Sequence, residues 1–233
     1  MKKVLVVAFL AFTLVSCATQ APSGGGIPID LVPMYGGMNR NADPGLKEGD
    51  EQFIAGVTRE FGTREKASAE FVETGFQYFR SNDLANAMRR FNQSWLLNPD
   101  NPEAYVGFAS VISAQGKACE ATRLMEKALA LNPPEVQGIY PDAGSMFALC
   151  GASDKSLSPT EKLNVLRRSE EIFAIAEQVE PNKAYVYDQW ATAYFWRGQL
   201  AEAWTMVKKQ RAAGGVPDEE FLQLLRSEMP EPN

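Results

Sequence analysis

A spacing of 34 residues recurs in the middle of this chain, and it constrains the fold more than any other feature. Three pairs of residues keep this distance: Ala87 and Ala121, Phe91 and Met125, and Pro99 and Pro133. A period in this range is typical of proteins in which each unit is a pair of helices, and one such unit cannot bury its apolar face alone. The spacing therefore predicts an all-α protein built from stacked helix pairs.

Each unit reads as two helices joined by a short polar turn, near residues 82–83 in the first unit and 115–116 in the second. Small residues recur where the helices must cross closely, and larger apolar residues fill the remaining space. A proline after each second helix prevents that helix from continuing. The matched segments are Phe71-x2-Thr74-Gly75-x2-Tyr78 with Ala87-x3-Phe91 and Asn98-Pro99, then Tyr105-x2-Phe108-Ala109-x2-Ile112 with Ala121-x3-Met125 and Asn132-Pro133.

Two more units follow, and the third is stretched. Its second-helix proline, Pro181, comes 48 residues after Pro133, which is 14 more than the period. We expect most of the excess at residues 151–160, as an enlarged loop before a long second helix that begins at Ser158. The fourth unit is followed by a last helix over 217–228, and residues 229–233 are expected to fray. The matched segments are Tyr140-x2-Ala143-Gly144-x2-Phe147 with Ser169-x3-Phe173, and Tyr187-x2-Trp190-Ala191-x2-Tyr194 with Ala203-x3-Val207.

These segments resemble the tetratricopeptide repeat, whose pattern is aromatic-x2-Leu-Gly-x2-Tyr, then Ala-x3-Phe, then Pro. The resemblance implies a superhelix of about four helix hairpins within residues 63–229, at about 68–101, 102–135, 137–183 and 184–216. We expect a capping helix over 217–228 and an extra N-terminal helix over 47–62, with Asp50 as its cap and Thr63 as the cap of the next helix. A generic helical bundle is the alternative, but it does not predict the 34-residue spacing.

The resemblance also implies a concave face, lined mainly by first helices, that binds a peptide or protein. The lysine and asparagine pattern with which some relatives clamp a C-terminal carboxylate is absent. The alternative is that the aromatic residues of this face pack on the N-terminal segment or on the capping helix. The candidate groove residues are Val72, Phe76, Phe79, Arg80, Val106, Ser110, Ser113, Tyr185, Asp188, Gln189, Thr192, Phe195 and Trp196.

The first residues of the chain look like a bacterial lipoprotein leader. Two lysines precede an apolar run over 4–15, which is shorter than the roughly 20 residues that span a bilayer. The sequence Leu14-Val15-Ser16-Cys17 resembles a lipobox, so we expect residues 1–16 to be a signal peptide and Cys17 to carry lipid. Ala18 is not the aspartate that retains such proteins in the inner membrane, which implies the outer membrane, facing the periplasm. An ordinary signal peptide with a chance cysteine is the alternative.

Residues 17–46 read as a lipidated tether with a flexible Pro-Ser-Gly composition at its start. Residues 27–35 are unusual for a linker, because they alternate prolines with large apolar side chains. We expect this strap to be extended. It either packs on the surface of its own domain, or fills the domain's own groove, or pairs with a partner.

The other two cysteines form an even pair in an oxidising compartment. The repeat fold places Cys119, near the start of one helix, beside Cys150, near the end of the neighbouring antiparallel helix. This implies a Cys119–Cys150 disulfide; two buried thiols are the alternative.

Composition narrows the function. The chain has no histidine, which excludes imidazole-dependent nucleophiles and His-containing metal sites, and its net charge of −6 disfavours a nucleic-acid surface. The acidic runs Glu170-Glu171 and Asp218-Glu219-Glu220 are expected on solvated faces or at helix N-termini, and not in metal sites. We expect no cofactor, no metal and no catalysis, but an adaptor for a protein or peptide in envelope assembly or maintenance. The alternatives are a pilotin-like assembly factor for a secretin or pilus, and an envelope hydrolase or its activating subunit.

Overall fold

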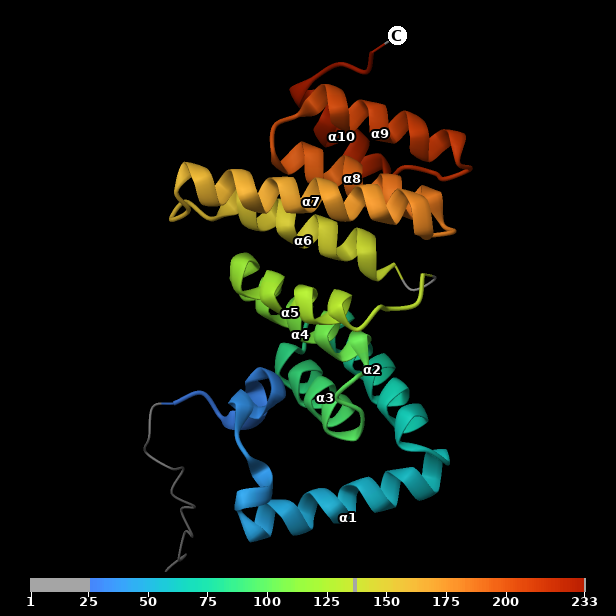
Figure 1. Ribbon diagram of the computed structural model, residues 1–233. Coiled ribbons are helices and arrows are strands. Elements are labelled where there is room, and N and C mark those ends of the chain that lie inside the picture. The colour runs from blue at the N-terminus through green and yellow to red at the C-terminus, as the bar shows by residue number, and fades with distance from the viewer. Residues whose placement is uncertain (1–25, 136–137, 233) are drawn as a thin grey trace, which may run out of the picture.

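The computed structural model describes residues 26–135 and 138–232, and within them it contains α-helices and short 3-10 turns but no strand (Figure 1). The all-α prediction is confirmed. The helices are α1 (Pro44–Phe61), α2 (Arg64–Arg80), α3 (Leu84–Leu97), α4 (Pro102–Ala114), α5 (Ala118–Ala130), α6 (Ile139–Ser153), α7 (Pro159–Val179), α8 (Lys183–Trp196), α9 (Leu200–Ala212) and α10 (Glu219–Glu228). The 3-10 turns are η1 (Ile29–Leu31), η2 (Pro33–Gly37) and η3 (Arg40–Ala42).

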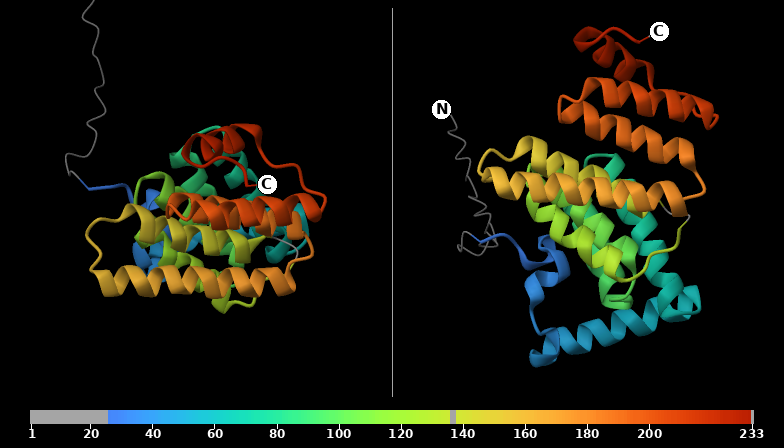
Figure 2. Two further views of the ribbon diagram at one scale, coloured as in Figure 1. Left: turned by 90° about the horizontal axis from the view of Figure 1, so that it is seen from above. Right: turned by 45° about the horizontal axis from the view of Figure 1, so that its top comes forward.

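Consecutive helices pack as hairpins, and the hairpins stack. The pairs α2–α3, α4–α5, α6–α7 and α8–α9 make the most extensive contacts, and the first helices also meet one another where α2 contacts α4 and α6 contacts α8. Figures 1 and 2 show α1 at one end of this stack and α10 at the other. The arrangement is that of a helical repeat.

Several helix ends follow from local chemistry that the sequence predicts. The Thr63 side chain accepts a hydrogen bond from the Lys66 amide and caps α2, and Ser158 forms a full capping box with Glu161 at the start of α7. The predicted Asp50 cap is wrong, because Asp43 caps α1 from the position before Pro44. A proline is well placed at the first position of a helix, where its missing N–H is not needed, so α1 begins earlier than expected.

The first two hairpins are packed around one phenylalanine. Phe91 of α3 is fully buried, and its ring lies against the backbone of α2 at Gly75 and of α4 at Gly107. A Cβ atom would lie 2.5 Å from the ring at Gly75 and 2.3 Å at Gly107, so no larger residue fits at either position without displacing the ring. Phe76 and Phe108 meet the same ring edge to face, at centroid distances of 5.0 and 6.3 Å.

The last two hairpins also pack a phenylalanine ring against a helix glycine, and they add polar contacts. Phe173 of α7 lies against Gly144 of α6 and stacks on Trp190 of α8, with centroids 5.1 Å apart. Glu170 accepts hydrogen bonds from Trp190 Nε1 at 3.3 Å and from the Tyr194 hydroxyl at 2.9 Å, and it pairs with Arg197. Glu170 is therefore half-buried and bonded to protein groups, which the expected solvated face does not include, whereas Glu171 beside it is exposed as expected.

The third hairpin holds most of its extra residues in helix and fewer of them in loop. The segment between α6 and α7 runs only over 154–158, since residues 151–153 belong to α6, and α7 is 21 residues long. The expected enlarged loop at 151–160 is wrong in this respect, although the long second helix is confirmed. Pro141 does not interrupt α6 because it is the third residue of the helix, where its missing N–H has no intrahelical partner.

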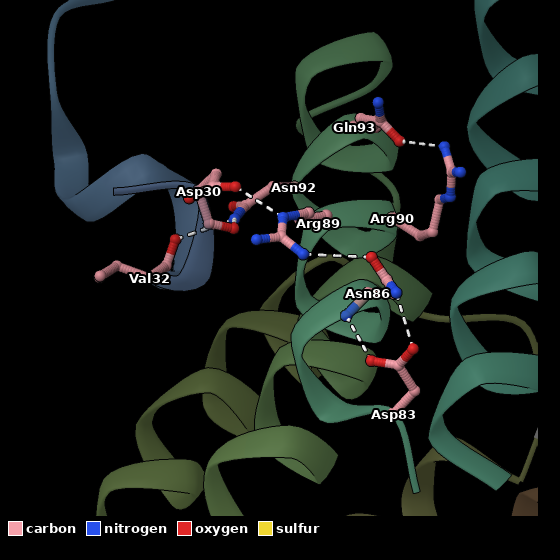
Figure 3. A network of polar contacts seen from close by, with 8 residues as sticks. All are labelled: Asp30, Val32, Asp83, Asn86, Arg89, Arg90, Asn92 and Gln93. Atoms are coloured by element: carbon pink, nitrogen blue, oxygen red, sulfur yellow. Dashed lines mark hydrogen bonds and ion pairs between the residues drawn. The ribbon is translucent and has the colours of Figure 1, made fainter. Parts of the chain in front are cut away.

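The strap at residues 27–35 is docked on α3, together with the two glycines that follow it (Figure 3). Asn92 of α3 donates from Nδ2 to the carbonyls of Asp30 and Val32, at 2.9 and 3.0 Å, and its Oδ1 accepts from the amide of Tyr35 at 3.2 Å. Arg89 pairs with the Asp30 carboxylate at 2.6 Å. The strap thus packs on the surface of its own domain, which is the first of the three arrangements expected from the sequence.

The strap is coiled, and the expectation of an extended conformation is wrong. Met34 and Tyr35 have φ values of 53° and 50°, in the left-handed region that side chains other than glycine avoid, and Gly36 and Gly37 continue the turn. The turn buries Tyr35 to 7% exposure, and the Arg40 guanidinium lies over its ring at 4.1 Å. Burial and the hydrogen bonds from Asn92 offset the backbone strain.

The C-terminal tail at residues 229–232 packs on the domain, contrary to the fraying expected for residues 229–233, of which Asn233 lies outside the described residues. Trp204 Nε1 donates to the Met229 carbonyl at 3.1 Å, and Glu231 pairs with Arg211 at 2.5 Å and with Arg226. The predicted signal peptide and Cys17 lie outside the described residues. Over the described ranges, no helix has the length and apolar character needed to cross a bilayer.

Candidate functional site

The first helices of the four hairpins line a cavity of about 540 Å³. Residues from α2, α4, α6 and α8 contribute, and α5 adds one side chain. The lining is Phe79, Ser110, Ser113, Ala114, Met125, Asp142, Ser145, Met146, Leu149, Gln189 and Trp196. The cavity therefore lies on the face where the sequence analysis expects a groove.

Five of the predicted groove residues lie in this lining: Phe79, Ser110, Ser113, Gln189 and Trp196. Phe79 and Trp196 are near the C-terminal ends of α2 and α8. Trp196 is 40% exposed, which leaves much of its ring free for an occupant of the cavity.

Four predicted groove residues serve the interior instead. Val72 and Val106 are buried at 4% and 5% exposure, and Phe76 packs on Phe91. Phe195 meets Phe221 of α10 edge to face at 5.7 Å, so it packs on the capping helix, as the alternative in the sequence analysis held.

The remaining four predicted groove residues lie outside the lining and bond to neighbouring protein groups. The Tyr185 hydroxyl donates to Asp142 Oδ1, Gln210 Nε2 donates to Asp188, and Thr192 Oγ1 donates to the Asp188 carbonyl. Arg80 is exposed and pairs with Glu73 at 3.2 Å.

The cavity has an apolar wall and a small polar end. Met125, Met146 and Leu149 face it together with the two aromatic rings. At the polar end, Ser145 Oγ donates to Gln189 Oε1 at 3.0 Å. The Gln189 amide nitrogen makes no hydrogen bond to another described residue, so it can donate to a ligand.

Asp142 is the single ionisable residue of the lining. Its carboxylate accepts a hydrogen bond from Tyr185 at 2.5 Å, and no ion pair joins it to a cation in the described part of the chain. Burial raises the pKa of Asp142 from 3.8 to about 6, and the hydrogen bond from Tyr185 opposes part of that rise. Burial also raises the pKa of Glu180, which lies near Asp142 at the turn between α7 and α8.

The sequence analysis missed the contribution of α6. Its register was available, because Tyr140, Ala143, Gly144 and Phe147 align the third unit with the others. In that register Ser145 occupies the position of Ser110, and Leu149 occupies the position of Arg80 and Trp196. Asp142 likewise occupies the position of Gln189, so applying the groove positions to α6 would have found all three residues.

The predicted disulfide is present. Cys119 and Cys150 are bonded, with their Cα atoms 4.7 Å apart, and they join the start of α5 to the end of α6. Cys150 follows Leu149 directly, so the crosslink holds the part of α6 that forms the apolar wall.

Comparison of the chain with protein-family models and with curated proteins finds no match. Across residues 26–135 and 138–232, no group of three or more Cys, Asp or Glu side chains is arranged to hold a metal ion. The arguments for function therefore rest on the cavity and on the repeat pattern.

Proposed function

We propose that this protein is a non-catalytic adaptor that binds a peptide or protein segment in the cavity on its first-helix face. The observation that carries the proposal is that four successive hairpins contribute one first helix each to a single cavity. Residues from such distant parts of the chain form a continuous surface only because the repeats stack. A largely apolar cavity with a few polar groups is suited to recognising a side chain and its backbone.

The tetratricopeptide-repeat assignment is part of this proposal. Its support is the 34-residue spacing together with the hairpins and with Phe91, which packs against Gly75 as the Ala-x3-Phe and Gly positions of the pattern require. The strap leaves the cavity open, because it contacts α3 and, through Met34, Lys127 of α5, and none of its residues is among the cavity lining.

The proposal is tested by photo-crosslinking in the cells that express the protein. A photoreactive residue at Ser113, in the cavity, should give discrete adducts, and the same residue at Glu171 on α7 should not. The double variant Phe79→Glu and Trp196→Glu should remove the adducts while the far-ultraviolet circular dichroism stays unchanged. Adducts that persist in a folded double variant would exclude the cavity as the binding site.

We also propose that a lipid on Cys17 anchors the adaptor to the outer membrane. The leader pattern supports this, and several acyl chains on one cysteine would give stable attachment. Replacing Cys17 by Ser should move the protein from the membrane fraction to the soluble fraction. A Cys17→Ser protein that stays with the outer membrane would refute lipid anchoring.

A further inference from the structure

The cavity contains one carboxylate among apolar neighbours, and this combination specifies its occupant further. The inference rests on the proposed function. Of the eleven lining residues, Asp142 alone carries a charge, and the described residues provide it with a hydroxyl partner but with no cation. A partly buried carboxylate in this position costs folding free energy unless a positive charge meets it.

We propose that the occupant is an apolar peptide segment with one basic side chain, whose cation pairs with Asp142. The apolar part of the segment contacts Met146, Leu149 and Trp196. A backbone carbonyl of the segment accepts from the Gln189 amide nitrogen, since Gln189 Oε1 is already engaged by Ser145. The three kinds of contact are complementary to the three kinds of group that line the cavity.

Segments of the described chain do not supply this occupant. The apolar strap is held on α3 by Asn92 and Arg89. The C-terminal tail is held by Trp204 and Arg211. We take the partner to be a separate polypeptide, and charge complementarity with Asp142 defines its chemistry.

Electrostatics around Asp142 point the same way. The neighbouring ionisable groups, Tyr185 and Glu180, are neutral or acidic. Burial raises the pKa of Asp142 to about 6, and a bound cation would lower that pKa again. The free energy lost when Asp142 ionises in the empty cavity is thus recovered when a basic side chain binds.

The test is a selection followed by a matched binding comparison. A library of random 12-residue peptides is selected on the purified full chain, and one selected peptide is then made in three forms. The forms carry Lys, norleucine or Glu at the basic position. Affinities are measured by fluorescence anisotropy for the wild-type chain, for Asp142→Asn and for Asp188→Asn. Asp188 lies on α8 outside the cavity lining and loses the same charge, so it controls for long-range electrostatics.

We expect the selected peptides to share apolar residues with one Lys or Arg. The Lys form should bind the wild-type chain and Asp188→Asn about equally. It should bind Asp142→Asn about tenfold more weakly, an effect between those of an exposed and of a buried ion pair. The norleucine form should bind all three chains alike. Of the three peptide forms, the Glu form should have the lowest affinity for the wild-type chain.

Equal binding of the Lys and norleucine forms to the wild-type chain would overturn the inference, as would equal weakening by Asp142→Asn and Asp188→Asn. A Leu149→Glu variant separates these failures from failure of the proposed function. If Leu149→Glu abolishes binding while the basic residue has no effect, the cavity binds peptides but does not select a cation. If Leu149→Glu has no effect, or if no peptide is selected, both proposals fail. If the chain forms a dimer and Leu149→Glu dissociates it, the occupant of the cavity is a second copy of the chain. That result would also overturn the inference.

Discussion

The hairpins α2–α5 and the hairpins α6–α9 both press a phenylalanine against a helix glycine, but they surround it with different chemistry. Phe91 is enclosed by apolar rings and by two glycine backbones. Phe173 has one glycine beneath it and a stacked tryptophan above, and Glu170 holds that tryptophan through a hydrogen bond. The packing around Phe91 therefore depends on the fit of shapes, and the packing around Phe173 depends also on polar contacts between α7 and α8.

The polar character of the second half continues beyond Glu170. Glu177 of α7 accepts from the Tyr187 hydroxyl and from Lys209 Nζ, both at 2.9 Å, which ties α7 to α8 and α9. The Lys209 ammonium lowers the pKa of Glu177, and burial raises the pKa of Tyr194 to about 12. The cavity lies across both halves and takes its apolar ring Phe79 from the first and its carboxylate from the second.

The largest expected effect is the loss of the Phe91 ring. Phe91→Ala should lower the free energy of unfolding by about 4 kcal/mol, because two helix backbones limit how far the space left by the ring can close. Phe173→Ala should cost about 3 kcal/mol, since the stacked Trp190 ring can move into part of the space. Urea unfolding followed by circular dichroism measures both, and an equal or larger loss for Phe173→Ala would contradict the comparison.

The disulfide joins the two halves, and its removal tests how far they depend on each other. The bond closes a sequence separation of 31 residues. The double variant Cys119→Ser and Cys150→Ser should therefore lose about 3 kcal/mol of stability in the loop-entropy account. Reductant should lower the stability of the wild-type chain by a similar amount and leave the double variant unchanged. A wild-type chain that reductant does not affect would show that the crosslink carries no stability.

The glycines allow the same comparison with the addition of one carbon atom. A Cβ at Gly107 would lie 2.3 Å from Phe91, and one at Gly144 would lie 2.9 Å from Phe173. Gly107→Ala should cost about 2 kcal/mol by overpacking, whereas Gly144→Ala should change stability by less than about 1 kcal/mol, because the helix propensity of alanine offsets a smaller clash.

Gly56→Ala is the matched control for these two variants. Gly56 lies inside α1 with no neighbouring atom within 4 Å of the added carbon. The substitution should stabilise the protein by up to about 1 kcal/mol through helix propensity alone. Stabilisation by Gly107→Ala would show that Phe91 has more freedom than its complete burial indicates.

Contacts that are local in sequence were predictable, and contacts between distant segments were not. The caps at Thr63 and Ser158 act within one helical turn, so their residue types were sufficient. The left-handed turn at Met34 and Tyr35 depends on Asn92, which lies 57 residues away from Tyr35. No periodicity in the strap itself contains that information.

The cavity residues likewise divide into features that the sequence predicts and features that it does not. The repeat register predicted Phe79, Ser110 and Trp196 because equivalent positions recur in each unit. Asp142 stands at the register position of Gln189, so its place was available from the sequence, but its environment depends on Tyr185, which is 43 residues further along the chain. The position of Gly107 was also missed, because its need for a small residue comes from the ring of Phe91 in another hairpin.

The smallest expected effect concerns Asp142, where the polar half contributes to the cavity. Its pKa in the folded chain is about 6, above the 3.8 of an ordinary aspartate, so the folded state binds more protons than the unfolded state between these values. The stability contributed by this group is fully present below pH 4, and it declines as the pH rises towards 6. Above pH 6 the carboxylate is ionised, and its burial lowers the free energy of unfolding by the full amount.

Asp142→Asn removes that cost and keeps an oxygen that accepts the Tyr185 hydrogen bond. At pH 7.5 the variant should therefore be more stable than the wild-type chain by about 1 kcal/mol, after allowance for the exposure that the side chain retains. At pH 4 the two chains should be equal within about 0.5 kcal/mol. Urea unfolding at both pH values measures the difference, and Glu202→Gln, an exposed acid on α9, should show no such pH dependence.

A gain at pH 7.5 would mean that the chain carries a carboxylate that weakens its own fold, which is expected of a group that serves a ligand and not the core. A loss at pH 7.5 would instead make Asp142 a structural partner of Tyr185.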